Sequence, residues 1–208
     1  MAFSQVNNEA DIEYAKECEE NGYKNCGEGV CAINEALKMN ISFNYAEPSD
    51  LTIKERILQR GYAGEELVFF YGLRQLPQLK RQGASDEEGI KKKLISYLER
   101  ASLKRIKLNS VFTLNDFEKM YFTKLGKKID YLKISTDDVS PQVDNDPSWA
   151  NKMSLDVGVI RNEFIIKMVE ERVNIYKKVM IVYGSGHLVQ TREALTKAFN
   201  SVENIKRY

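Results

Sequence analysis

The sequence predicts an α/β protein that is rich in helix, with one domain (1–208) built on a small, largely parallel or mixed central sheet. Residues 179–183 form an uninterrupted apolar run, which is typical of a strand buried on both faces. Residues 41–46 alternate apolar and polar side chains, the period of a strand. Gly184 and Gly186 then allow a tight turn before a helix from about Thr191. Strand, glycine turn and helix together predict the α/β class.

Capping residues and helical spacing predict helices before, between and after these strands. Residues 1–22 are an atypical N-terminal segment with a helix at about 9–21, and capping boxes at 85–88 and 113–116 open two later helices. Pro77 is expected to kink its helix or end its regular hydrogen bonding. Residues 129–134 fit either a short strand or a continuation of helix. Residues 137–149 are predicted to form a surface loop, which either covers a site or only connects the neighbouring elements. The predicted helices span 9–21, 27–39, 50–60, 64–81, 85–100, 114–126, 154–176 and 191–199.

Composition excludes several classes of protein. A net charge of +1 gives no global field that would attract nucleic acid or an anionic membrane. No apolar run approaches the roughly 18 residues of a membrane span. The first residues show no secretory signal, and Cys18, Cys26 and Cys31 make neither a CxxC pair nor a zinc set. We therefore expect a cytoplasmic protein with reduced cysteines, although a secreted parent without its leader fits as well. The expected partner is a small-molecule ligand or substrate. The oligomeric state is not predicted.

Three residues carry the predicted site. His187 is the only histidine and lies on the predicted turn, at the carboxyl edge of the sheet where ligands bind. Arg161 belongs by spacing to an apolar helix stripe, so it needs a carboxylate or an anionic ligand. Glu47 ends the other strand and is the expected partner. These groups suit acid–base chemistry with an arginine-stabilised oxyanion. The alternatives are a structural ion pair for Arg161 and a helix cap for Glu47.

Five further residues are weaker candidates for the site. Tyr71, Arg74 and Gln78 share a helix face and are interpreted either as ligand contacts or as helix-packing contacts. Gly184 and Ser185 would bind substrate through the turn. The chain contains no complete dinucleotide fingerprint, no phosphate-binding P-loop and no GxSxG elbow. A divalent metal would have to be held by His187 and Glu47 with water.

Three motifs occur in order along the chain: Glu47-Pro48, then Arg161-Asn162-Glu163 on a helix, then Gly184-Ser185-Gly186-His187 after an apolar run. This ordered set resembles the TraB, PrgY, GumN, Tiki, erythromycin-esterase and ChaN superfamily, and the last motif resembles the GxxH motif of that superfamily. The usual first motif, which contains another histidine or acidic residue, has no counterpart here, and Glu28 is the nearest substitute. The resemblance implies a hydrolase, either esterase-like or a metal-dependent protease. The alternative is a non-catalytic protein that keeps the pocket for an anionic or haem-like ligand.

Overall fold

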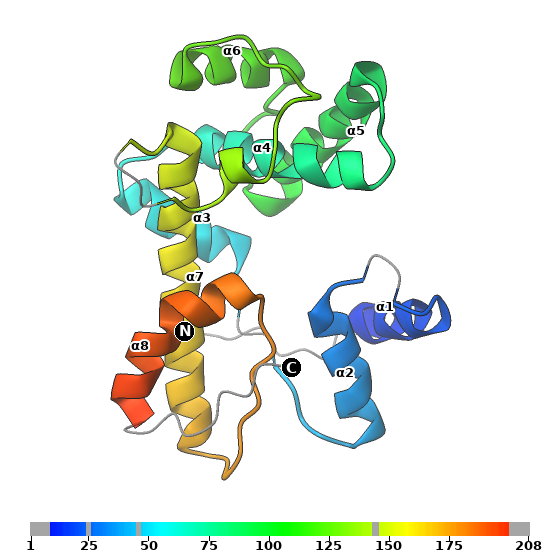
Figure 1. The fold of residues 1–208 in the computed structure, drawn as a ribbon, viewed down its shortest axis with the longest axis vertical. Coiled ribbons are helices and arrows are strands. Elements are labelled where there is room, and N and C mark those ends of the chain that lie inside the picture. Colours follow the sequence, from blue (N-terminus) through cyan, green and yellow to red (C-terminus); the bar gives the residue numbers. More distant parts are fainter. Residues whose placement is uncertain (1–8, 24–25, 45–46, 143–145, 200–208) are drawn as a thin grey trace. The chain divides into compact units, whose positions relative to one another are not determined.

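The computed structural model describes residues 9–23, 26–44, 47–142 and 146–199. The chain divides into two compact units (Figure 1). Unit 1 comprises residues 1–48 and 161–208, and unit 2 comprises residues 49–160. The helix α7 (Trp149–Val173) contributes its first part to unit 2 and its second part to unit 1.

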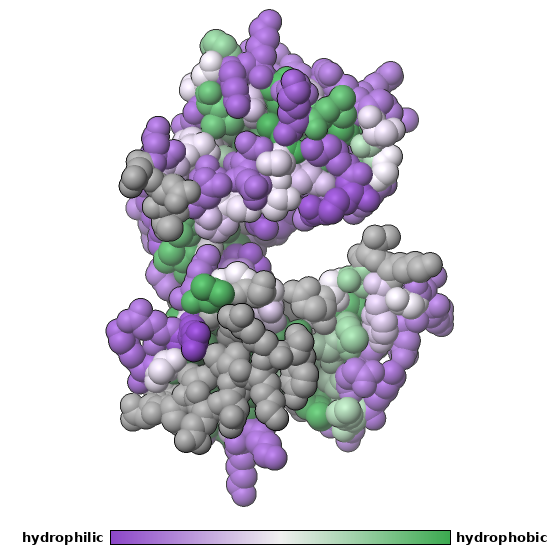
Figure 2. Space-filling model, viewed as in Figure 1, coloured by the Kyte–Doolittle hydropathy of each residue, from purple (hydrophilic) through white to green (hydrophobic). Residues whose placement is uncertain are grey.

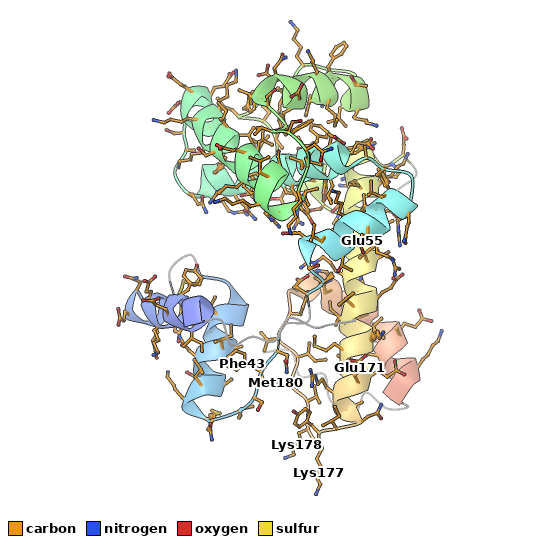
Figure 3. The ribbon with its side chains drawn as sticks, turned by 180° about the vertical axis from the view of Figure 1, so that it is seen from behind. Phe43, Glu55, Glu171, Lys177, Lys178 and Met180 are labelled. Carbon is orange, nitrogen blue, oxygen red and sulfur yellow. A yellow bond between two sulfur atoms is a disulfide. The ribbon has the colours of Figure 1, made fainter. Side chains whose placement is uncertain are left out.

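The predicted α/β class is wrong, because the described residues contain helices and no strand. The run 179–183 is irregular and is not buried on both faces: Met180 is 87% exposed and Ile181 is 41% exposed. Just before this run, Lys177 and Lys178 extend away from the ribbon (Figure 3). Residues 41–44 are also irregular, and 45–46 lie outside the described residues. A strand requires a neighbour for its backbone hydrogen bonds, which a local apolar pattern cannot supply.

The helix α4 (Gly64–Arg81) is the centre of unit 2. It packs against α3 (Asp50–Gln59), α5 (Glu87–Arg100), α6 (Leu114–Leu125), and the short helices η1 (Ala101–Arg105) and η2 (Asp137–Val139). A Cβ atom on Gly72 of α4 would lie 2.8 Å from the Phe117 ring and 3.0 Å from Leu98. The glycine therefore permits the close approach of α5 and α6 to the central helix.

Local signals in the sequence set most helix ends in unit 2. Thr113 and Asp116 form the predicted capping box of α6, and Gly126 ends this helix with a φ of 70°. Asp86, rather than Ser85, caps α5 by accepting a hydrogen bond from the Gly89 amide at 2.7 Å. The helix α4 continues through Pro77 to Arg81. Residues 129–134, left undecided between strand and helix, are neither of these and include a turn.

In unit 1, α1 (Glu9–Glu20) packs against α2 (Glu28–Lys38). Cys18 and Cys26 form a disulfide that closes this helical hairpin, and Cys31 is free and exposed. The structure thus differs from the expected three reduced thiols. The buried Asn34 side chain of α2 donates to the backbone carbonyl of Ala15, which joins the two helices inside the hairpin.

The second half of unit 1 contains the rest of α7 and the helix α8 (Ser185–Phe199). The helix α7 begins at Trp149, five residues before the predicted start, and ends at Val173. The helix α8 begins at Ser185, so His187 lies in its first turn rather than on a loop before it. The amide of His187 donates to the carbonyl of Gly184 at 3.0 Å. This early start places the histidine on a rigid element.

Candidate functional site

Glu47 and Arg161, which are 114 residues apart in sequence, form a two-point ion pair in unit 1. Nε of Arg161 donates to Oε2 of Glu47 at 2.9 Å, and a terminal nitrogen of the guanidinium donates to Oε1. The side chain of Arg161 is 23% exposed and that of Glu47 is 40% exposed. Burial disfavours the guanidinium charge, but hydrogen bonds and the charge of Glu47 outweigh burial and raise the pKa of Arg161. The guanidinium of Arg161 therefore stays charged.

Tyr183 lies beside this ion pair. The Cζ atom of Arg161 is 5.8 Å from the centroid of the Tyr183 ring, an arrangement that permits a cation–π contact. The hydroxyl of Tyr183 is buried and makes no hydrogen bond of regular geometry to the described residues. Burial, followed by the nearby carboxylate of Glu47, raises the pKa of Tyr183 above its ordinary value. The hydroxyl consequently keeps its proton at neutral pH.

His187 packs against the ring of Tyr183. The His187 and Tyr183 rings meet edge to face, with centroids 4.7 Å apart. Nδ1 of His187 is 2.6 Å from Oδ1 of Asn162, while Nδ2 of Asn162 donates to Oε1 of Gln190 at 2.6 Å. Because an amide oxygen only accepts, Nδ1 carries the ring proton in this contact. When the ring is neutral, its lone pair is then on Nε2.

Glu47 and Arg161, which the sequence predicts as partners, therefore meet in the structure, and Asn162 holds the Nδ1 side of the His187 ring. The histidine, the tyrosine and the ion pair belong to one cluster.

The weaker candidates have other places in the structure. Tyr71, Arg74 and Gln78 belong to α4 of unit 2. Tyr71 is 6% exposed, and the Arg105 guanidinium lies 4.8 Å from its ring centroid. The Cζ atom of Arg74 lies 5.8 Å from the centroid of Phe70. These contacts of Tyr71 and Arg74 are thus with side chains of unit 2.

The two residues of the predicted glycine turn have local roles in the backbone. The carbonyl of Gly184 accepts the first hydrogen bond of α8, from His187. Ser185 begins α8, and its side chain lies outside the part of the structure that is described.

Sequence reasoning missed Asn162, Tyr183 and Gln190 as members of the cluster. The apolar run predicts that Tyr183 ends a buried strand, and Asn162 enters the sequence analysis only as the residue after Arg161 in the superfamily resemblance. Gln190 lies three positions after His187 in α8, which places both residues on one helix face. That spacing was the one local signal that could have identified it.

Within the described residues, no three or more His, Cys, Asp or Glu side chains are grouped so that they could hold a metal ion. The described helices also include none with the length and apolar character needed to cross a membrane. Both searches concern the described part of the chain alone.

The fold and site define a helical protein with a histidine–tyrosine cluster supported by an ion pair. Comparison of the chain with protein-family models, with curated proteins and with solved structures finds no match. The superfamily resemblance stays a prediction based on the short motifs around Glu47, Arg161 and His187.

Breaking the Glu47–Arg161 pair is expected to destabilise the protein. We expect Arg161→Met or Glu47→Gln to lower the free energy of unfolding by about 1–2 kcal/mol, less than for a fully buried pair because both side chains are partly exposed to water. A double-mutant cycle by chemical denaturation should show that the two losses are not additive. Lys197→Gln, which breaks the exposed pair with Glu193, is the control and should have no measurable effect. Additive losses would contradict the pairing.

Proposed function

We propose that this chain is a hydrolase in which His187 acts as general base. The observation that carries the proposal is the Asn162–His187 contact, with the ring of Tyr183 edge to face against the imidazole. A base whose orientation is fixed by a second side chain, next to a proton donor, is a recurring arrangement in acyl-transfer enzymes. The short motifs that resemble the erythromycin-esterase and TraB superfamily agree with this reaction class.

In the proposed reaction, Nε2 of His187 removes a proton from water, and the water oxygen attacks an acyl carbonyl carbon. The carbonyl oxygen becomes an oxyanion, for which the hydroxyl of Tyr183 and the guanidinium of Arg161 are the candidate hydrogen-bond donors. As the tetrahedral intermediate collapses, the bond to the leaving group breaks, and the imidazolium of His187 returns the proton to the leaving atom. Asn162 positions His187, and Glu47 positions Arg161.

The test is a screen of chromogenic esters, lactones and short peptides with the wild-type chain and two variants, each assayed with and without a chelator. We expect His187→Gln to lower kcat by about 10²–10⁴-fold, the usual contribution of a general base. Glu193→Gln changes an exposed residue of the same helix and should keep full activity. Unchanged turnover in His187→Gln would end the proposal for this site.

Asn162→Ala gives a second readout, because Asn162 is proposed to position the histidine rather than to touch substrate. We expect this variant to lower kcat while KM stays nearly constant. If no substrate is turned over while an anionic small molecule binds with a dependence on Arg161, the non-catalytic alternative is favoured.

A further inference from the structure

One helix face in unit 2 is unusual for its combination of exposed apolar and basic side chains. The residues recur at helical spacing through α5 and η1 and are all exposed. Ile95 is 49% exposed and Leu103 is 44% exposed. The upper part of Figure 2, which is unit 2, shows small hydrophobic areas among hydrophilic ones on the side that is drawn. We call the exposed side of α5 and η1 the α5–η1 face. It comprises Ile95, Ser96, Glu99, Arg100, Leu103 and Lys104.

The charge of this face differs from the near-neutral balance of the whole chain. Arg100 and Lys104 outweigh Glu99 within the face, and Lys92 and Lys93 are exposed one turn earlier. Two other cations of this segment are already used: Arg105 is paired with Asp50 at 2.8 Å, and Lys91 is paired with Glu87 at 2.7 Å. The cations on the exposed side therefore give a local positive field that the net charge of +1 conceals.

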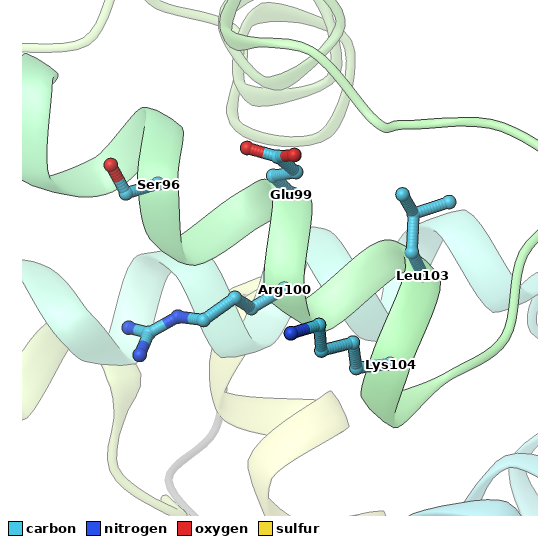
Figure 4. Close-up of a pocket in the computed structure, with 5 residues that line it drawn as sticks. All are labelled: Ser96, Glu99, Arg100, Leu103 and Lys104. Carbon is cyan, nitrogen blue, oxygen red and sulfur yellow. The ribbon is translucent and has the colours of Figure 1, made fainter.

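The face is also hollowed. A shallow depression of about 450 Å³ is lined by Ser96, Glu99, Arg100, Leu103 and Lys104. Figure 4 shows these five side chains around the hollow, all from one stretch of helix. Leu103 supplies an apolar contact, and Arg100 and Lys104 supply positive charge. An aromatic ring flanked by carboxylates would be complementary to such a depression.

The helix α1 of this same sequence has that chemistry. On its exposed side, Glu13, Glu17 and Glu20 outnumber Lys16, so the side is acidic. Tyr14 lies among them and is 50% exposed. The acidic side of α1, with its tyrosine, and the α5–η1 face, with its basic hollow, are complementary in both charge and apolar character.

We propose that the α5–η1 face is a docking surface for a second copy of this chain, which binds through the acidic side of its α1 helix. Tyr14 of one copy enters the hollow beside Leu103 and Arg100 of the other. Glu13 and Glu17 pair with the cations of the face. The contact joins two different surfaces, so it is heterologous and leads to a ring or to open association. The proposal is independent of the hydrolytic activity.

The test is sedimentation velocity of the full chain over a range from about 1 to 200 μM, at about 50 mM and about 500 mM salt. We expect association that grows with concentration and weakens in high salt. The variants Arg100→Glu/Lys104→Glu and Glu13→Lys/Glu17→Lys should each raise the dissociation constant at least about tenfold. All four side chains are exposed, so both variants are expected to fold.

An equimolar mixture of the two reversed variants is the decisive sample, because it pairs a basic α1 with an acidic α5–η1 face and should restore association. Lys127→Glu/Lys128→Glu makes the same charge change on exposed residues elsewhere in unit 2 and should leave association unchanged. A wild-type chain that stays monomeric throughout, or a mixture that fails to associate, overturns the proposal. Binding of the monomer to phosphatidylserine vesicles that is lost in Arg100→Glu/Lys104→Glu would also overturn it, by assigning the face to a membrane.

Discussion

Replacing Phe117 by alanine is expected to lower the free energy of unfolding of unit 2 by about 3–5 kcal/mol, the usual cost of truncating a fully buried phenylalanine. Phe117 is 0% exposed, and its ring centroid lies 5.0 Å from that of Phe69 on α4. The ring also fills the space above Gly72, which has no side chain of its own. Truncation would therefore open a cavity between α4 and α6 that the central helix cannot fill.

Trp149 provides the measurement, because it is the only tryptophan and belongs to the same cluster of rings. Its ring centroid lies 5.3 Å from that of Phe69, so its fluorescence during chemical denaturation reports on unit 2. Phe122→Ala is the matched control: Phe122 is on the same helix but is 57% exposed, and its loss should cost less than about 0.5 kcal/mol. Equal shifts of the two midpoints would contradict the described packing of α6.

Removing the Cys18–Cys26 disulfide is expected to have the second-largest effect on stability. The bond joins residues eight apart in sequence, for which loop-closure entropy predicts a stabilisation of about 2.5 kcal/mol. We expect Cys18→Ala/Cys26→Ala to increase the rates of amide hydrogen exchange in α1 by roughly 50- to 100-fold. This factor is the lost stabilisation of about 2.5 kcal/mol, converted to an equilibrium constant. The buried hydrogen bond from Asn34 to Ala15 should keep part of the hairpin formed.

Alkylation followed by mass spectrometry tests the bond directly. Unreduced protein should take up label on Cys31 alone, and reduced protein should take up label on all three cysteines. Cys31→Ala is the control for exchange, because Cys31 is exposed and outside the bond, and it should leave protection of α1 unchanged. Labelling of all three cysteines without reductant would show that the hairpin is closed by packing only.

Local sequence signals accounted for the helices and part of the site. The Thr113–Asp116 capping box and the left-handed Gly126 define α6 within the chain itself, because each acts on backbone groups a few residues away. Arg161 was recognised because an arginine among apolar side chains needs an anionic partner, and Glu47 was its expected partner. The structure brings these two together.

The sequence by itself determined the presence of the helices and the capped ends of α6, and that Arg161 requires an anionic partner. Only the tertiary structure decided whether the apolar run 179–183 pairs with a neighbour, and in the described residues it does not. Likewise, only the folded chain brings Tyr183 and Asn162 against His187, and Cys18 against Cys26. The physical reason is the range of the interactions. Caps and helical spacing act within a few residues, whereas strand pairing and side-chain clusters depend on segments that are distant in sequence.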